Sequence, residues 1–272
     1  TLIVVSDILD KENIIRSKYY FELCAKFVGG RKPITAGDYL FKEPISTCRV
    51  AIRIARGVSG IPEIKITIPE GMSNKQVAAL LEKNILYFDS AFFIEHAREN
   101  EGFLFPDTYF FSENATSSVI LLAMSDNFNK RTLLLTEEIK ASGHSLRDIV
   151  IMASILEKEA TTLEDKAIVS GILWKRISIG MPLQVDASFL YLLDKKSSAV
   201  TVEDIQMKST YNTYTNKGLP SGPIGNPGLE AIRSALRPTV SPYLYYLSGN
   251  NGVMHYAKTF EEHKENKAKY LK

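Results

Sequence analysis

The chain has 272 residues, of which 45% are hydrophobic and 24% are charged, and these fractions are typical of a globular protein with a buried core. Lys and Arg number 33 against 31 Asp and Glu, a formal net charge of +2, so the sequence lacks the clustered basic excess that usually accompanies nucleic-acid binding. Its two cysteines, Cys24 and Cys48, exclude a cysteine-rich zinc module and leave open one disulfide or two buried thiols.

The first part of the chain reads as helix followed by a small mixed region. We expect residues 1–32 to be helical. Two stretches read as strands, Ile34–Phe41 and Ile64–Ile68, the second by strict alternation of apolar and polar residues. Ser73 and Gln76 have the spacing of a capping box, which predicts the start of a further helix.

The second part is predicted to be mainly helical, with one long irregular segment. Helices are expected at 116–142, 145–160 and 162–179. Ser145 and Asp148 have the spacing of a second capping box, at the start of the middle helix. The segment 211–228 is dense in Tyr, Asn, Gly and Pro, and loops of this length are usually functional. After it, Tyr243–Leu247 reads as a strand.

The helix expected at 145–160 ends in two glutamates, Glu157 and Glu159. Residues 149–156 are apolar almost all round, which predicts a buried core helix. The two glutamates are about 200° apart around the helix axis, so they face different sides. A carboxylate at the edge of apolar material has a raised pKa, which a general acid needs. The alternative is a solvated helix end, and the pattern alone leaves this choice open.

Two further segments carry polar groups that suit a sugar or a peptide. Gln184 and Asp186 are two residues apart, so in an extended segment their side chains point to the same side. The alternative is a polar strand edge. In the 211–228 segment, Tyr211 and Asn212 combine a ring that can stack on a sugar with hydrogen-bonding groups. The alternative there is a long structural crossing.

The sequence offers no sign of a metal site or a cofactor. The histidines are scattered, no His or Cys pair has ligand spacing, and no Gly-rich phosphate loop occurs, so we expect neither a metal nor a cofactor. No apolar run approaches the roughly 20 residues of a membrane helix. The chain begins at Thr1 rather than Met, so we expect a fragment whose natural N-terminus has been removed.

Several short motifs occur in an order that is familiar from one family. In chain order they are Glu101-Gly-Phe, Phe105-Pro-Asp-Thr-Tyr109, Ala153-Ser-Ile-Leu-Glu-Lys-Glu159, Leu183-Gln-Val-Asp186, Tyr211-Asn-Thr-Tyr214, Gly218-Leu-Pro220 and Pro223-Ile224. Together they resemble the MltG-type (YceG-like) endolytic murein transglycosylases. The chain departs from the pattern at Val185 and Ala187, where relatives often carry Thr or Ser and then Pro, so a hydroxyl is missing here.

The resemblance implies an α+β fold in three parts. These are an N-terminal helical segment at 1–32, a small LysM-like mixed module at 33–88, and a larger mixed α/β catalytic domain at 89–272. It also implies a single-pass anchor in the bacterial cytoplasmic membrane, which precedes the sequence in hand, and a catalytic part on the extracytoplasmic side in the cell envelope.

The resemblance further implies an enzyme that cleaves peptidoglycan glycan strands between N-acetylmuramic acid and N-acetylglucosamine. The product end is a 1,6-anhydro-muramyl group, and the enzyme terminates nascent strands, with cell-wall synthases as expected partners. Glu159 takes the place of the family's catalytic acid and base. The expected substrate-binding residues are Gln184, Asp186, Tyr211, Asn212 and Glu101.

Two other functions remain as alternatives at this stage. The first is a muramidase that hydrolyses the same bond with two carboxylates, Glu159 and Asp186. The second is a non-catalytic peptidoglycan-binding protein, in which the LysM-like module binds glycan and the large domain is a scaffold.

Overall fold

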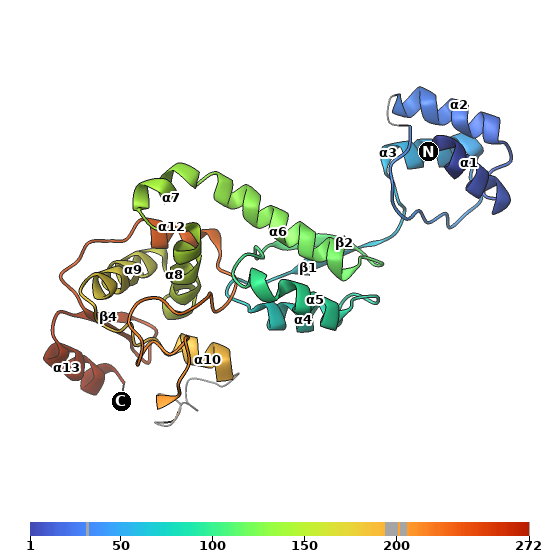
Figure 1. The fold of residues 1–272 in the computed structure, drawn as a ribbon. Helices are drawn as coiled ribbons and strands as arrows, with labels where there is room; N and C mark the ends of the chain where they lie inside the picture. Colours follow the sequence, from blue (N-terminus) through green and yellow to red (C-terminus); the bar gives the residue numbers. More distant parts are fainter. Residues whose placement is uncertain (31–32, 194–200, 202–205, 272) are drawn as a thin grey trace. The chain divides into compact units, whose positions relative to one another are not determined.

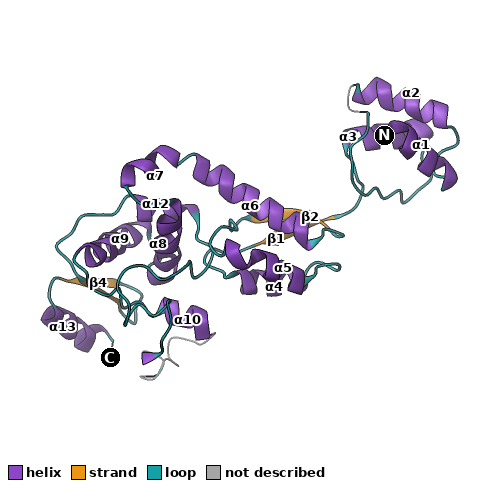
Figure 2. Cartoon of the chain, in the orientation of Figure 1, coloured by secondary structure: helices purple, strands orange, loops and turns teal. Residues whose placement is uncertain are grey.

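The structure is a computed structural model that describes residues 1–30, 33–193, 201 and 206–271. It contains two compact units, which we describe separately: unit 1 is Thr1–Ile64 with Ser112–Asn114, and unit 2 is Lys65–Phe111 with Ala115–Lys272. Helices predominate, and the strands of the described residues form two two-stranded sheets (Figure 2), so the predicted α+β class is confirmed. The division into units falls inside 33–88, and the boundaries of the LysM-like module stay a prediction.

Unit 1 contains three helices, α1 (Leu2–Lys11), α2 (Lys18–Gly29) and α3 (Thr47–Arg56). The helical region expected at 1–32 is therefore two helices, because Ser17 adopts an extended backbone and its side chain caps the first turn of α2. A disulfide between Cys24 and Cys48 joins α2 to α3. This pairing resolves the choice that the sequence leaves open.

The strand expected at Ile34–Phe41 is absent, and this segment is irregular. Its backbone pairs with the end of α3 and the segment after it instead of another strand: Thr35 N–H donates to Ile54 O, and Leu40 N–H donates to Ser59 O. Ile34, Tyr39 and Phe41 pack against the core of unit 1. This packing accounts for the apolar residues that suggested a strand. The strand prediction was wrong because packing against α3 replaces a sheet partner.

Unit 2 holds the remaining elements (Figure 1). In chain order they are β1 (Glu63–Thr67, whose first two residues belong to unit 1), α4 (Asn74–Glu82), α5 (Ser90–Ala97), the 3₁₀ helix η1 (Arg98–Asn100), β2 (Thr108–Ser112, whose last residue belongs to unit 1), α6 (Ser117–Leu133), α7 (Thr136–Ser142), α8 (Leu146–Glu159), α9 (Leu163–Ser178), α10 (Ala187–Leu193), α12 (Leu229–Leu236), β3 (Tyr245–Ser248), β4 (Met254–Ala257) and α13 (Phe260–Tyr270). β1 pairs with β2, and β3 pairs with β4 in antiparallel register. Within the described ranges, no helix combines the length and the apolar character that a membrane span requires.

The helix expected at 116–142 is broken into α6 and α7. No Gly or Pro marks the break, which lies at Leu134 and Leu135. Leu135 leaves helical geometry and is 3% exposed, in the main core. Burial of this side chain, which local propensity does not encode, therefore fixes the break.

Helix α8 is the centre of the main core of unit 2. Ser145 and Asp148 form the predicted capping box at its start, and all eight residues from Ile149 to Leu156 are buried. α9 and α12 pack against it. A helix buried all round has little freedom to move, so the side chains at its C-terminal end are held in a fixed place.

A buried asparagine, Asn226, joins three distant segments of unit 2. Its side-chain amide donates to Asn74 Oδ1 at 2.8 Å and to Met72 O at 3.0 Å, and its Oδ1 accepts from Leu104 N–H at 3.0 Å. Its backbone N–H donates to Met72 O, and its carbonyl accepts from Gly71 N–H. Asn226 has no exposed surface, so the chain around α4 and the chain before α12 are held together by a fully satisfied polar group.

Candidate active site

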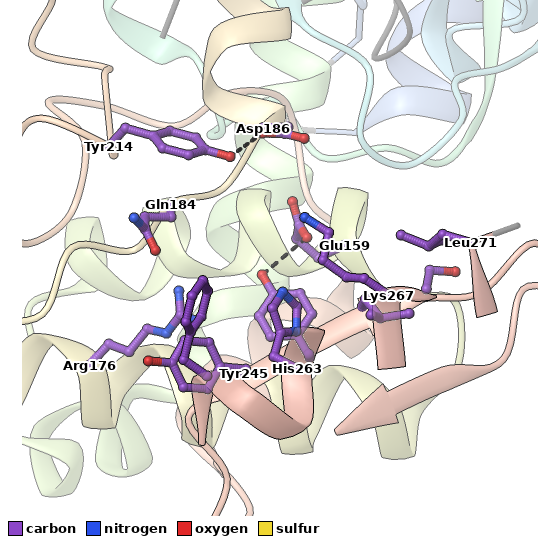
Figure 3. A pocket seen from close by; sticks show the side chains of 13 residues that line it. Glu159, Arg176, Gln184, Asp186, Tyr214, Tyr245, His263, Lys267 and Leu271 are labelled. Atoms are coloured by element: carbon purple, nitrogen blue, oxygen red, sulfur yellow. Dashed lines mark hydrogen bonds between the residues drawn. The ribbon is translucent and has the colours of Figure 1, made fainter. Parts of the chain in front are cut away.

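Glu159 is the last residue of α8 and faces a cavity of about 400 Å³, which we call the Glu159 cavity. Its lining residues are Glu159, Arg176, Gln184, Asp186, Tyr214, Tyr245, Tyr246, Leu247, Ser248, Phe260, His263, Lys267 and Leu271. Figure 3 shows Asp186 and Tyr214 on one side of Glu159, and Arg176, Tyr245 and His263 on the other. The sequence pattern left open whether this end of α8 is solvated or lies at the edge of the core. In the structure it lies at the edge of the core, beside a polar cavity.

The environment of Glu159 favours its protonated form. Burial raises its pKa to about 7, and the negative charge of Asp186 adds to this rise. Tyr246 donates its hydroxyl to Oε2 at 3.0 Å, which opposes the rise, as does the charge of Arg176. A carboxyl group with a pKa near neutrality can donate a proton and take it back at physiological pH.

The segment before α10 supplies a polar wall of the Glu159 cavity. Gln184 and Asp186 are exposed and line the cavity, while Leu183 and Val185, which alternate with them, are buried. Gln184 has a φ of 51°, in the left-handed region, which a non-glycine residue adopts at a cost and often near a functional site. Asp186 Oδ1 accepts from the Tyr214 hydroxyl at 2.6 Å, so its carboxylate is oriented before a ligand arrives.

The sequence analysis missed most of the other lining residues, and four of them are polar side chains near Glu159: Arg176, Tyr246, His263 and Lys267. Arg176 lies on α9, is 5% exposed, and donates to the carbonyls of Leu244 and Leu183. It thus holds two walls of the cavity together and places a cation near Glu159. No local motif marks any of the four, because α9, β3 and α13 bring them to Glu159 only in the folded chain.

The second glutamate, Glu157, lies on the other side of the helix end. Its Oε1 forms an ion pair with Lys166 at 2.5 Å, and the two side chains are 7% and 5% exposed. Its Oε2 accepts from Gly228 N–H at 2.9 Å. Both oxygens are therefore bound within the protein, which is the arrangement of a structural carboxylate.

Glu101 faces a second cavity, of about 960 Å³, that adjoins the first. This central cavity lies between α4 and α10, and Glu159, Asp186 and Ser248 line both cavities. Glu101 accepts from Asn74 N–H, at 3.1 and 3.2 Å to its two oxygens, and from the Tyr191 hydroxyl at 3.1 Å. Burial raises the pKa of Glu101 to about 7, against the opposing effect of these donors.

Tyr211 and Asn212, the two residues expected from the loop, have different places in the structure. Tyr211 lines a third cavity together with Glu101. Asn212 has no exposed surface, and it is not the surface loop residue that the loop composition suggests. Its amide donates to Met207 O, and its Oδ1 accepts from the N–H groups of Tyr214 and Thr215. These bonds shape the loop, and a sugar contact by Asn212 stays a prediction.

The arrangement is suited to acid and base chemistry by one carboxyl group. Within the described ranges, no group of three or more His, Cys, Asp or Glu could hold a metal ion. Glu159 combines a pKa near 7, a single hydroxyl donor and an adjoining cavity large enough for a sugar chain. Polar side chains around it can hydrogen-bond hydroxyl and amide groups of such a chain.

Comparison with known proteins places these residues in a family context. The profile of the YceG-like family matches residues 1–269. The "Endolytic murein transglycosylase" of Bacillus subtilis (strain 168) is 30% identical over 294 residues, which cover 98% of this chain and 81% of that protein. The protein of the same name in Streptococcus pneumoniae (strain ATCC BAA-255 / R6) is 26% identical, and the match covers 97% of this chain and 55% of that protein.

Among solved structures, a protein of Listeria monocytogenes described as yceG-like has a similar fold. Its 2.6 Å crystal structure aligns with a TM-score of 0.68 and 27% sequence identity, over 97% of this chain and 95% of that one. The likeness therefore extends over both units of the chain.

Proposed function

The chain belongs to the YceG-like family, and from that premise we propose that it is a lytic transglycosylase of peptidoglycan in which Glu159 is the acid and the base. The observation that carries the proposal is the state of Glu159: a partly buried carboxyl with a pKa of about 7, at the join of two polar cavities. Peptidoglycan as the substrate class is supported by the names of the relatives.

The proposed reaction needs one carboxyl group because the nucleophile is part of the substrate. Protonated Glu159 donates its proton to the glycosidic oxygen as the bond from muramic acid C1 to that oxygen breaks. The C6 hydroxyl of the same muramic acid attacks C1, and the carboxylate of Glu159 takes the proton of that hydroxyl. No water is consumed, and the ring geometry supplies the proximity that an external nucleophile lacks.

The other cavity residues would bind and orient the sugar. Gln184 offers an amide with no hydrogen bond to another described side chain, and Asp186 is oriented by Tyr214. The negative charge of Asp186 also favours the protonated form of Glu159 before the reaction. As positive charge develops at C1, a nearby carboxylate stabilises it. This is a supporting role for Asp186, distinct from the second catalytic carboxylate of a muramidase.

The wider biological setting is proposed from the family resemblance. It comprises action on the extracytoplasmic side of the cytoplasmic membrane, a membrane anchor outside the sequence in hand, termination of nascent strands and work beside cell-wall synthases. The LysM-like module at 33–88 belongs to the same proposal.

Product analysis tests the reaction and separates it from its alternatives. Purified glycan strands are digested with the protein, and the fragments are analysed by mass spectrometry. Transglycosylation gives fragments with a 1,6-anhydro end, lighter by one water molecule than fragments with a free reducing end. Reducing ends would instead establish a muramidase, and binding to sacculi with no released fragments would establish a non-catalytic binding protein.

A further inference from the structure

A third cavity, of about 460 Å³, continues the row of cavities beyond the central one. We call it the arginine cavity; its lining includes Arg98, Glu99, Glu101, Arg147, Tyr211 and Gly222. Glu101 lines both this cavity and the central cavity, which Glu159 also lines. A substrate held at Glu159 can therefore extend past Glu101 and reach the two arginines.

The guanidinium groups of the arginine cavity are largely free to bind a ligand. Arg98 follows α5, and its side chain has no hydrogen bond or ion pair with the residues that the structure describes. Arg147 uses Nη2 to donate to Ser221 O at 2.8 Å and has no ion pair with a described residue. Arg147 also lies in the first turn of α8, where the helix dipole disfavours a cation unless an anion is bound nearby.

Tyr211, which lines the arginine cavity, is closely packed against its neighbours. A Cβ atom at Gly222 would lie 2.6 Å from the Tyr211 hydroxyl, so a larger residue there would displace this tyrosine from its place. The Tyr211 ring lies against that of Tyr191, with centroids 5.4 Å apart, and Tyr191 donates to Glu101. The wall shared with the central cavity is thus fixed in place before a ligand binds.

The charge of the cavity favours an anion. Two arginines face Glu99 and Glu101. Burial raises the pKa of Glu101 to about 7, so near neutral pH its carboxyl carries only part of a negative charge. Two full positive charges then exceed the negative charge around the same space. Arginine is also the side chain best suited to bind a planar carboxylate with two parallel hydrogen bonds.

We propose that the arginine cavity binds a carboxylate that the glycan strand carries beside its sugars, and so positions the strand on Glu159. This inference rests on the proposed function. Peptidoglycan offers two sources of this chemistry: the carboxylates of the peptide arm, and the lactyl carboxylate of muramic acid from which the peptide has been removed.

The experiment compares strands that differ only in charge. KM and kcat are measured for the parent protein, for Arg98→Gln and for Arg147→Gln, on native peptide-bearing strands and on the same strands with their carboxylates converted to amides. Sedimentation with native and amidated sacculi reports binding without cleavage. Arg233→Gln is the matched control, because Arg233 is an exposed arginine of α12 outside the three cavities. Arg98→Lys and Arg147→Lys test whether positive charge alone suffices.

The parent should bind native strands more tightly than amidated strands. Each Gln variant should raise KM on native strands on the order of tenfold, with kcat nearly unchanged, since a charge-assisted hydrogen bond is lost away from the reacting atoms. The Lys variants should recover part of the affinity, and Arg233→Gln should match the parent. On native strands the lactyl carboxyl is held in an amide bond, so an arginine effect on them assigns the peptide arm. An arginine effect that appears only on strands freed of peptide by an amidase assigns the lactyl carboxylate.

The proposal is overturned if the ratio of native to amidated affinity is the same in the parent and in the two Gln variants, both on peptide-bearing strands and on strands freed of peptide. A failure of the proposed function looks different. In that case no strand is cleaved by any variant, while sedimentation still shows whether the arginines distinguish native from amidated sacculi.

Discussion

The two sides of the last turn of α8 carry the same side chain in opposite settings. On one side, Glu157 is paired with Lys166 and accepts from Gly228 N–H, so both of its oxygens are used within the fold. On the other side, Glu159 has one hydroxyl donor, Tyr246, and an open cavity. A buried carboxylate with its partners in place supports structure, whereas one that is buried without an ion pair keeps its proton near neutral pH.

The largest expected effect is on cleavage by Glu159→Gln. The substitution keeps the shape of the side chain and removes its proton transfer, so the rate of strand cleavage should fall on the order of 10²–10⁴-fold. The measurement is the release of soluble fragments from strands, with circular dichroism to check folding. A variant that cleaves at the parental rate would mean that another group carries the proton.

The next effect is on stability, by Glu157→Gln. This change leaves the buried Lys166 without its counter-charge, and removing one partner of a buried pair costs about 3–5 kcal/mol. Denaturant unfolding measures the loss, and the folded fraction should still cleave strands.

Adding Lys166→Met to Glu157→Gln sharpens this test. The double variant removes the unpaired cation and keeps an acceptor for Gly228 N–H, so it should be more stable than Glu157→Gln alone. If Glu157→Gln instead keeps its stability and loses cleavage, the roles of the two glutamates are reversed.

A smaller effect is expected in the pH dependence of stability. The folded-state pKa of Glu159, about 7, lies above its unfolded value of about 4.3. The folded protein therefore binds more protons between these values, and the contribution of Glu159 to stability is lost as pH rises through 7. Glu159→Gln should be as stable as the parent or more stable at pH 8, with the difference shrinking toward pH 4. Thermal melting of the parent and of Glu159→Gln across this pH range measures the difference. If Glu159→Gln is clearly less stable than the parent at pH 8, Glu159 is a well-paired structural carboxylate.

The smallest effect is expected for Tyr246→Phe. The hydroxyl of Tyr246 stabilises the charged form of Glu159, so its removal should raise the pKa of Glu159 further. The alkaline limb of the kcat profile should then move to higher pH. Tyr256→Phe is a matched control on β4, because its hydroxyl bonds Asp165 instead. A profile that moves equally in both variants would argue against a specific role for Tyr246.

The sequence predicted the parts of the fold that depend on local signals. The capping boxes at Ser73 and Ser145 are present, and the apolar run at 149–156 is the buried core helix that its pattern indicates. The α6–α7 break at Leu135 and the irregular segment at 34–41 were not predictable in this way. Both depend on what a side chain packs against after folding, which no local pattern contains.

The candidate site was predictable only where a motif carried it. Helical periodicity placed Glu157 and Glu159 on different sides but could not assign them, since Lys166 and Tyr246 reach them from other elements. The resemblance singled out Glu159. It also suggested Asn212 as a sugar ligand, and the structure shows that residue inside the loop with its amide occupied. A family motif can thus contain residues that hold a loop in shape beside residues that are expected to contact a ligand.

The polar junction at Asn226 has a consequence for how the molecule assembles. Its hydrogen bonds join positions 152 and 122 residues apart in the chain. A ribosome makes the partner residues Asn74 and Leu104 long before residue 226, and contacts of such long range form late in folding. The row of cavities therefore stays unfinished until most of the chain has been synthesised. In hydrogen exchange, the amide protons of Leu104 and Asn226 should be released only when unit 2 opens as a whole.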